Sequence, residues 1–334
     1  MYNSFDNPGL VKVLTFLQTH NTEYLSGQDL SDVLRISRVA IWKHIKKIQE
    51  LGYTVESKQK LGYKLISNSD LLLPWEITSE LKTEIIGQQA YYFDSIESTQ
   101  TQALKMAKDG ERNGVIIVAE KQTGGKGRSG RKWISPKGGL WFSIILHPKF
   151  DISITTLFPI ASALALSITL EKIFNISPEL KWPNDLTIKG KKIAGMLVDV
   201  SLESNKIENL VLGVGINFDV NVKEIEKSLK GTPNFYGVAS LGEQKKKIKP
   251  VKLIQRFLVE LEKTYKLLEN RQTSKIISEW IKRSSTIGKT VELNTINGNI
   301  KGKAVKIDND GALVISENKK NHRIIAGDII HLSK

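Results

Sequence analysis

At residues 124–133 the chain reads Gly-Gly-Lys-Gly-Arg-Ser-Gly-Arg-Lys-Trp. This segment is the most informative one about the fold and function of the central part of the chain. A phosphate-binding P-loop would need a lysine and then a serine or threonine after Gly130, where this chain has Arg131. The glycines at 125, 127 and 130 match the dinucleotide-binding spacing and follow a predicted strand. However, Pro136 and a strand follow them instead of the required helix.

The remaining interpretation is a flexible loop that closes over an anionic ligand. Its four glycines allow close backbone approach, and its four cations are Lys126, Arg128, Arg131 and Lys132. Cations of this kind donate charge-assisted hydrogen bonds to carboxylates and phosphates. The alternative is an ordinary charged surface loop.

Two further segments carry candidate site residues. Residues 181–185 read Lys-Trp-Pro-Asn-Asp and residues 191–195 read Lys-Lys-Ile-Ala-Gly, which together predict one hairpin with its tip near Gly190. Asp185 is a candidate Mg²⁺ ligand, and Lys192 is placed to face a carboxylate or phosphoryl oxygen. Residues 213–217, Gly-Val-Gly-Ile-Asn, predict a glycine-bearing strand that a flat ligand or a neighbouring backbone approaches closely.

The surrounding sequence predicts an α+β fold rather than a doubly wound parallel sheet, because several strands look hairpin-linked. The longest apolar stretch, 156–170, contains Pro159 and is expected to be too short to span a bilayer. Helices are predicted at 77–86, 99–108, 156–174, 223–230, 252–269 and 274–283, and strands at 91–93, 115–120, 140–147, 179–182, 192–200 and 207–217.

The first 67 residues predict a winged helix-turn-helix. Three helices, at 8–20, about 27–34 and 38–51, precede a hairpin at 53–66, with Ser26 and Ser37 as N-caps. On the third helix one face is apolar, and the outer face carries a net charge of +3 over residues 37–51, which suits a DNA major groove. The alternative is a solvated lysine-rich helix. Within the helix-turn-helix at 27–46, the predicted DNA-binding residues are Ser37, Arg38, Val39, Trp42, Lys43 and Lys46. Trp42 either reads bases or packs against the wing, whose predicted cations are Lys58, Lys60 and Lys64.

The last 49 residues, 286–334, change to short alternating runs. Turn signals at Asn297-Gly298 and Asp310-Gly311 separate them and predict a small five-stranded barrel. Strands are predicted at 290–293, 300–307, 312–316, 323–326 and 329–332.

The composition limits which partners and reactive groups the protein can have. The net charge of +14 suggests polyanionic or phosphorylated partners. The chain has no cysteine, which excludes disulfides, cysteine-ligated zinc and cysteine nucleophiles, and its five histidines lack metal-ligand spacing. With no visible signal peptide, we expect a soluble cytoplasmic protein.

Taken together, the motifs resemble the biotin–protein ligases, and specifically the bifunctional members that also repress the biotin operon. The resemblance covers nearly the whole chain and rests on Gly-x-Gly-Arg-x-Gly-Arg-x-Trp, Lys-Trp-Pro-Asn-Asp and Lys-Ile-Ala-Gly in the family's order. It implies a winged-helix domain at 1–67, a mixed α/β catalytic domain of the biotin/lipoate ligase type at 68–285 and an SH3-like barrel at 286–334.

The resemblance also implies the activity. Biotin's carboxylate attacks the α-phosphorus of ATP with Mg²⁺, and a lysine of a biotin carboxyl carrier protein then takes the biotin. The adenylate also acts as corepressor and favours a homodimer on operator DNA. Rival interpretations are a lipoate ligase, a ligand-sensing transcription factor and a monofunctional ligase with a vestigial winged helix.

Carried over residue by residue, the resemblance assigns roles to the candidate site. Lys192 and Arg128 are catalytic, Gln122 contacts biotin, Trp133 is a wall for the adenine, and Asp185 holds Mg²⁺. The biotin and adenylate contacts are Ser98, Thr99, Gln100, Gln122, Gly125, Lys126, Gly127, Arg128, Trp133, Asn184, Lys192 and Gly195. Lys126 replaces a common arginine and loses its bidentate fork, which predicts weaker adenylate retention. The C-terminal residues 329–334 lack the arginine expected near the nucleotide.

Overall fold

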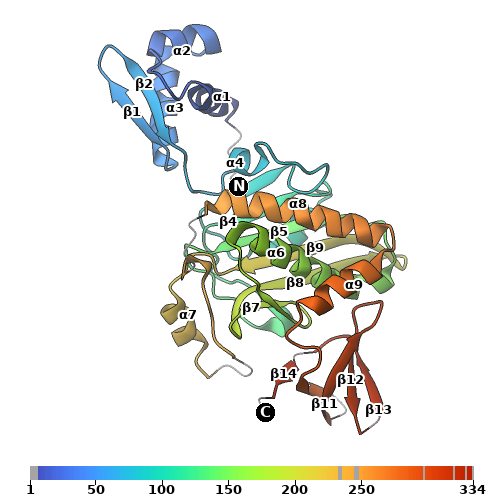
Figure 1. Ribbon diagram of the computed structural model, residues 1–334. Coiled ribbons are helices and arrows are strands. Elements are labelled where there is room, and N and C mark those ends of the chain that lie inside the picture. Colours follow the sequence, from blue (N-terminus) through green and yellow to red (C-terminus); the bar gives the residue numbers. More distant parts are fainter. Residues whose placement is uncertain are drawn as a thin grey trace.

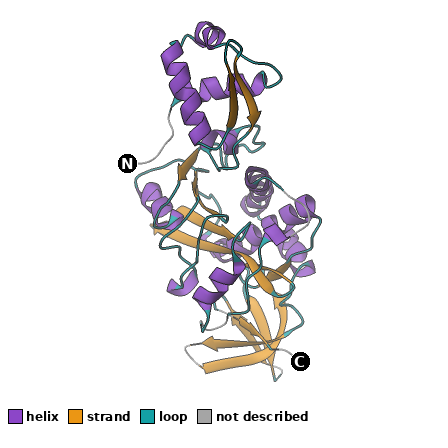
Figure 2. Cartoon of the chain, turned by 90° about the vertical axis from the view of Figure 1, so that its left-hand side faces the viewer, coloured by secondary structure: helices purple, strands orange, loops and turns teal. Residues whose placement is uncertain are grey.

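The computed structural model describes residues 7–231, 235–243, 248–295, 298–318, 320–327 and 329–332. It has three parts in a row: an N-terminal helical domain, a central sheet covered by helices, and a small C-terminal sheet (Figure 1). A view from the side shows the same order along the molecule (Figure 2). The predicted α+β class is confirmed, since helices and largely antiparallel strands are mixed.

The N-terminal domain has the predicted helix order and hairpin. Ser26 accepts a hydrogen bond from the backbone N–H of Asp29 at 3.0 Å, and Ser37 accepts one from Ala40 at 3.3 Å, so both predicted N-caps are confirmed. Gly52 ends the third helix with a φ of +87°. The elements are α1 (Pro8–Thr19), α2 (Gly27–Leu34), α3 (Arg38–Glu50), β1 (Thr54–Lys58) and β2 (Gly62–Ser67).

The central sheet has seven strands in the order β3-β4-β5-β9-β8-β7-β6. Strands β3 and β4 run parallel, and every other neighbouring pair is antiparallel. The strands are β3 (Ala90–Phe93), β4 (Ile116–Ala119), β5 (Leu140–Leu146), β6 (Glu179–Lys181), β7 (Asp185–Ile188), β8 (Lys191–Glu203) and β9 (Lys206–Ile216).

Strand β7 corrects the predicted single hairpin around Gly190. The chain turns at 182–184, pairs Asp185–Ile188 back onto β6, and turns again at Lys189 and Gly190, which both have positive φ. Two hairpins therefore replace one. Asp185 begins the middle strand and pairs with Gly195 across from it, which places the two motifs side by side.

Helices cover both faces of the sheet. Alternate strand residues face opposite ways, so Ile117 and Val211 pack beneath α5, whereas Ile116 and Val118 belong to the larger core under α8. The remaining helices match their predicted places within about two residues. They are α5 (Thr99–Lys108), α6 (Phe158–Phe174), α7 (Val222–Leu229), α8 (Pro250–Glu269) and α9 (Thr273–Lys282).

Helix α6 corrects the expectation that the longest apolar stretch is too short to span a bilayer. With the 3-10 turn η2 (Ile152–Leu157) before it, the segment Ile152–Phe174 is long and apolar enough by length and composition. Most of it is buried, however, and α6 packs against α8, α9 and β8. Being apolar on all sides, it is a central core helix of this domain.

The predicted helix at 77–86 is wrong. Only α4 (Pro74–Thr78) forms, and Glu80 then takes a left-handed φ of 56°. The backbone N–H groups of Glu84, Ile85 and Ile86 donate instead to the buried carboxylate of Glu262 on α8, at 2.8, 2.9 and 2.9 Å. Burial acts to raise the pKa of Glu262, but these hydrogen bonds and Lys266 lower it overall.

The C-terminal sheet has five antiparallel strands in the order β13-β12-β11-β10-β14. The pairings of the described residues do not join β13 to β14, so the predicted five strands are confirmed but not a closed barrel. Of the predicted turns, Asn297 lies outside the described residues, and Gly311 has the expected positive φ of +90°. The strands are β10 (Thr290–Thr295), β11 (Gly298–Ile307), β12 (Leu313–Glu317), β13 (Lys320–Ile324) and β14 (Ile329–His331).

Trp182 attaches this sheet to the central domain. Its indole N–H donates to the carbonyl of Gly311 at 3.0 Å, and its backbone N–H donates to the Thr286 hydroxyl at 3.1 Å, which in turn lies 3.2 Å from the His331 ring. Burial, together with nearby Lys181 and Lys289, lowers the pKa of His331 to about 4. His331 is therefore neutral in the folded protein at neutral pH.

Candidate active site and DNA-binding face

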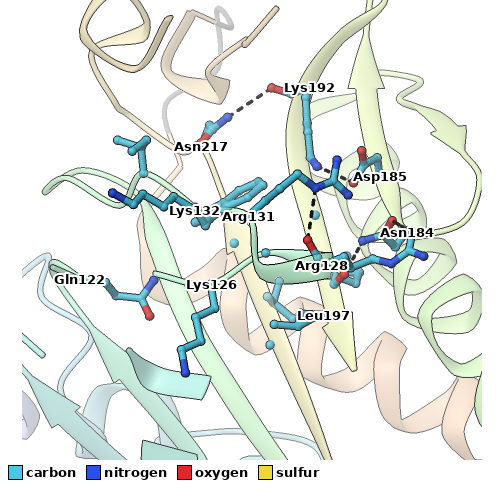
Figure 3. A pocket seen from close by; sticks show the side chains of 18 of the residues that line it. Gln122, Lys126, Arg128, Arg131, Lys132, Asn184, Asp185, Lys192, Leu197 and Asn217 are labelled. Atoms are coloured by element: carbon cyan, nitrogen blue, oxygen red, sulfur yellow. Dashed lines mark hydrogen bonds and ion pairs between the residues drawn. The ribbon is translucent and has the colours of Figure 1, made fainter. Parts of the chain in front are cut away.

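A cavity of about 390 Å³ lies over β8 and β9, and we call it the main cavity (Figure 3). The closing loop, residues 124–133, forms one wall. The N-terminus of α5 forms a second, and α7 with residues 235–238 forms a third. The predicted substrate residues that line it are Ser98, Thr99, Gln100, Gln122, Lys126, Gly127, Arg128, Trp133, Asn184, Lys192 and Gly195, together with Asp185.

Gly125, the one remaining predicted residue, lines an adjoining cavity that the closing loop also borders. Its position requires a glycine, because a Cβ there would lie 2.4 Å from the carbonyl oxygen of Trp133. The loop folds back on itself through a hydrogen bond from Gly127 N to Arg131 O at 2.7 Å and another from Trp133 N to Gly125 O at 2.9 Å. A 3-10 turn, η1 (Arg128–Gly130), forms its tip. The loop is therefore a folded-back loop and not the start of a helix.

Neutral polar side chains, which we call the neutral polar network, line the end of the cavity next to α5. Ser98 caps α5 by accepting from Thr101 N at 3.3 Å. Gln122 Oε1 accepts from the backbone N–H of Thr99 at 2.8 Å and from its hydroxyl at 3.1 Å. The Gln100 carboxamide accepts from Ser143 at 3.0 Å and donates to Asp199 at 2.8 Å. These buried side chains hold each other in fixed orientations, which suits recognition of a neutral polar ring.

The opposite end of the cavity is cationic. Lys192 Nζ lies 2.6 Å from Asp185 Oδ1 and 4.9 Å from the centre of the Trp133 ring. The Lys192 side chain is 25% exposed and that of Asp185 15%, so this ion pair is only partly reached by water. A pair in this setting interacts more strongly than a surface pair, and an incoming anion could compete for the ammonium.

Arg128 links the closing loop to both other parts of the site. Its guanidinium donates to Asn184 Oδ1 at 3.2 Å and to the carbonyl of Gly327, between β13 and β14, at 3.4 Å. Asn184 is buried and also donates to the Met196 carbonyl at 2.5 Å. Figure 3 shows Arg128 beside Asn184, while Lys126 points away from Lys192 and Asp185. The two predicted loop cations therefore lie in different surroundings.

Protein side chains closely approach the glycine-bearing strand β9. A Cβ at Gly215 would lie 2.4 Å from the Trp133 indole nitrogen, and one at Gly213 would lie 2.5 Å from Gln100 Oε1. Trp133 thus lies flat against the cavity floor. Its indole N–H is buried and finds no hydrogen-bond partner among the described residues. A Cβ at Gly195 would lie 3.2 Å from the edge of the same ring.

Sequence reasoning missed part of the lining. Tyr236 and Val238, which follow α7, and Leu197 on β8 all face the main cavity. Tyr236 donates a hydrogen bond to Asp185 Oδ2 at 2.5 Å. The α7 sequence carries only an amphipathic pattern, and the motif Lys-Trp-Pro-Asn-Asp does not reveal which distant residue reaches Asp185.

The outer face of α3 is exposed as predicted. Ser37, Arg38, Lys43 and Lys46 are exposed, and the exposed fractions of Val39 and Trp42 are 65% and 51%. The exposure of Trp42 favours the first of its two predicted roles, because a side chain packed against the wing would be buried. In the wing, Lys60 is exposed at the turn, whereas Lys64 donates to the Thr22 carbonyl at 2.8 Å.

Comparisons with known proteins agree with this arrangement. The sequence model of the Biotin/lipoate A/B protein ligase family matches residues 92–217, a helix-turn-helix (HTH) model matches 10–64, and the Biotin protein ligase C terminal domain model matches 286–332. A biotin protein ligase from Aquifex aeolicus, solved in complex with biotin and ATP, is similar in fold. Its TM-score is 0.61 at 27% identity, over 72% of this chain and 97% of that one.

A helix-turn-helix domain joined to a core of the biotin/lipoate ligase type defines a class of ligases that carry a DNA-binding domain. Two curated relatives are bifunctional ligase/repressor BirA proteins. The one from Bacillus subtilis is 36% identical over 94% of this chain and 95% of its own length. The one from Escherichia coli is 29% identical over 93% and 94%. The chain belongs to the bifunctional ligase/repressor family.

Proposed function

We propose that the chain activates biotin with ATP to biotinyl-5′-AMP, transfers biotin to a lysine of a biotin carboxyl carrier protein, and represses biotin genes when the adenylate is bound. One observation carries the enzymatic part. The main cavity joins the neutral polar network at α5 to the cationic end at Lys192 and Arg128. Biotin has the same division, with a neutral ring system at one end and a carboxylate at the other.

The first half-reaction needs two anions held together. A biotin carboxylate oxygen attacks the α-phosphorus of ATP, and the bond from that phosphorus to the β-phosphate bridging oxygen breaks, releasing pyrophosphate. In our proposal Lys192 bridges the carboxylate and the α-phosphate, and Arg128 leaves Asn184 for the phosphate. Cations already placed where negative charge develops in the transition state lower the activation barrier. Holding the two substrates in the reacting geometry lowers it further.

The second half-reaction transfers the acyl group. The amine of a carrier lysine attacks the biotinyl carbonyl carbon, AMP departs with the electrons of the acyl–oxygen bond, and the amine loses a proton. The adenylate must survive until the carrier arrives. In our proposal the closing loop covers it and excludes water, with Gly125, Lys126 and Gly127 against the ligand.

The remaining assignments follow the positions of the side chains. Biotin's ring lies against Ser98, Thr99, Gln100 and Gln122, and the nucleotide lies near Asn184, Gly195 and Trp133. Mg²⁺ enters with ATP. Both oxygens of Asp185 are engaged by Lys192 and Tyr236, and no cluster of three acidic or histidine side chains occurs in the described part of the chain. The phosphates would therefore supply most of the metal's ligands, with Asp185 as the nearest carboxylate.

The regulatory part of the proposal rests on α3. Its exposed outer face lies in a major groove, with Ser37 and Arg38 at its N-terminal end facing phosphates and bases, with Val39, Trp42 and Lys43 along the bases, and with Lys46 facing a phosphate. A homodimer formed on adenylate binding would present two such helices to a two-fold symmetric operator. We propose domains at 1–67, 68–285 and 286–334 and a soluble, cytoplasmic protein.

One experiment tests the enzymatic proposal. The protein is incubated with ATP, Mg²⁺ and biotin, and biotinyl-5′-AMP is sought by mass spectrometry; we expect it only when both substrates are present. Lipoate in place of biotin should give no acyl-adenylate. A lipoyl-adenylate, or no adenylate at all, would contradict the proposal. If the protein forms the adenylate but transfers no biotin to a carrier domain, a ligand-sensing transcription factor is favoured instead.

A separate experiment tests the regulatory proposal. Footprinting on DNA upstream of biotin genes should show protection that strengthens when biotin and ATP are added together. Sedimentation under the same conditions should show a shift toward a dimer. A chain that forms adenylate but protects no DNA would be a monofunctional ligase with a vestigial winged helix.

A further inference from the structure

Tyr236 lies at the rim of the main cavity, just after α7, and the start of β8 holds its segment. The backbone N–H of Lys192 donates to the carbonyl of Gly237 at 3.0 Å, and the N–H of Ala239 donates to the carbonyl of Lys192 at 3.0 Å. The main chain on the C-terminal side of Tyr236 is therefore bonded to the residue whose side chain forms the cationic end of the cavity.

One carboxylate joins the two side chains. The Tyr236 hydroxyl donates to Asp185 Oδ2 at 2.5 Å, and Lys192 Nζ lies 2.6 Å from Asp185 Oδ1. Each oxygen of Asp185 thus faces a different donor. The side chain of Asp185 is only 15% exposed, so water cannot readily replace either donor.

A cation fixes the tyrosine ring from the other side. Lys181 Nζ lies 3.5 Å from the centre of the Tyr236 ring. Contacts of this kind attract a cation to the ring face and hold the ring's orientation. Tyr236 is thereby fixed by its backbone, by Lys181 and by Asp185, and its hydroxyl has little freedom to turn away.

This arrangement matters when an anion enters. An incoming carboxylate or phosphate has to draw the Lys192 ammonium away from Asp185. A largely buried carboxylate that loses its cation is strongly disfavoured unless another donor stays with it. The Tyr236 hydroxyl is placed to be that donor, because it occupies the other oxygen and does not depend on Lys192.

We propose that Tyr236 is a positioning residue that acts through Asp185: it keeps the carboxylate hydrogen-bonded while Lys192 turns to the anionic substrates. The inference rests on the proposed function and deepens it, because it assigns to Tyr236 control over how readily Lys192 is released. It predicts that loss of one hydroxyl slows the first half-reaction without disturbing the pocket for biotin's ring.

The test is Tyr236→Phe, which keeps the ring and its contact with Lys181. Biotin-dependent pyrophosphate release should fall about tenfold or more in kcat, in line with loss of a hydrogen bond to a charged group, while the KM for biotin changes less. Tyr91→Phe is the matched control. Tyr91 also donates to a carboxylate, that of Glu111 at 2.9 Å, but lies outside the main cavity, so this variant should keep full activity.

A double-mutant comparison separates positioning from packing. In an Asp185→Asn background, Tyr236→Phe should have little further effect, because in our proposal the hydroxyl acts on Lys192 through that carboxylate. An undiminished further fall in that background, or no change from Tyr236→Phe alone, would overturn the proposal.

A second readout does not depend on ligase activity. In the ligand-free protein, the NMR signal of the Lys192 side-chain ε-carbon, assigned by its loss in Lys192→Ala, should shift in Tyr236→Phe and not in Tyr91→Phe. An unshifted signal overturns the role of Tyr236 whatever the enzyme's reaction. Absence of biotin-dependent pyrophosphate release from the wild-type chain would instead contradict the proposed function.

Discussion

Replacing Lys192 by alanine removes the cation that lies against Asp185 at the cationic end of the main cavity. The substitution deletes an ammonium 2.6 Å from Asp185 Oδ1 and 4.9 Å from the centre of the Trp133 ring. The backbone bonds of this residue to Gly237 and Ala239 do not require its side chain, so the strand should keep its place. The variant therefore tests the charge itself.

The size of the effect follows from the role proposed for this ammonium. A preset donor to charge that develops in a transition state contributes about 100-fold to 1,000-fold in kcat, or roughly 3–4 kcal/mol. Because Lys192 is only 25% exposed, solvent should not replace it fully. We expect biotin-dependent pyrophosphate release to fall by about that factor. Stability should change far less, because Asp185 keeps its hydrogen bond from Tyr236.

The assay is continuous detection of pyrophosphate with ATP and biotin at saturation. Lys191→Ala is the matched control, because the neighbouring side chain is exposed and does not line the main cavity. The control should retain wild-type release. Unchanged release in Lys192→Ala, with the control also active, would refute the assignment of Lys192 and the idea that the cationic end binds the reacting anions.

Three further predictions concern the other parts of the chain. Glu262→Gln should lower the free energy of unfolding by about 2–4 kcal/mol in guanidinium titrations, because three backbone amides lose a buried charged acceptor. The control Glu203→Gln, on the exposed end of β8, should change this free energy little, and equal stability of both variants would contradict this account. Lys46→Ala should weaken binding to all DNA sequences and should reduce the salt dependence of the binding constant by about one released counterion, whereas Lys108→Ala on α5 should do neither. If the salt dependence of DNA binding is the same in Lys46→Ala as in the wild type, Lys46 makes no phosphate contact. His331 has a folded pKa of about 4 against 6.5 in the unfolded chain, so the unfolded state binds its proton first and stability falls as pH drops from 6.5 toward 4. The loss attributable to this group should be about 1 kcal/mol after allowance for its partial exposure, and His331→Gln should remove it; the same acid sensitivity in both proteins would exclude the effect.

Local signals predicted the elements whose stabilising contacts lie nearby in sequence. The helices begun by Ser26, Ser37 and Ser98 are such cases, since each cap accepts from an amide three residues on. The segment 77–86 fails for the opposite reason. Its amides are satisfied by Glu262, about 180 residues away, and no local pattern can reveal a partner at that separation.

The residues of the candidate site also fall into those with a local sequence signal and those without one. The motif residues converge on one cavity, because the hairpins of β7 and β8 bring Asp185 opposite Gly195 and next to Lys192. Tyr236 was not predicted, since it reaches Asp185 from a segment with no motif of its own. The glycines of β9 predicted a close approach, and the side chains of Gln100 and Trp133 approach two of them.

The charge distribution of the main cavity argues for an anionic occupant independently of any family likeness. Among its described lining residues there are five cations and a single acid, Asp185, so the cavity carries a large positive excess in a partly dry space. In the ligand-free protein the Arg128 guanidinium donates to the neutral oxygens of Asn184 and Gly327 at 3.2 and 3.4 Å. These long bonds between a charge and neutral groups are weaker than the bidentate pair that a phosphate offers. Ligand binding would replace the bonds of Arg128 to Asn184 and Gly327 with a bidentate pair to phosphate. It would thereby detach the loop from the turn between β13 and β14.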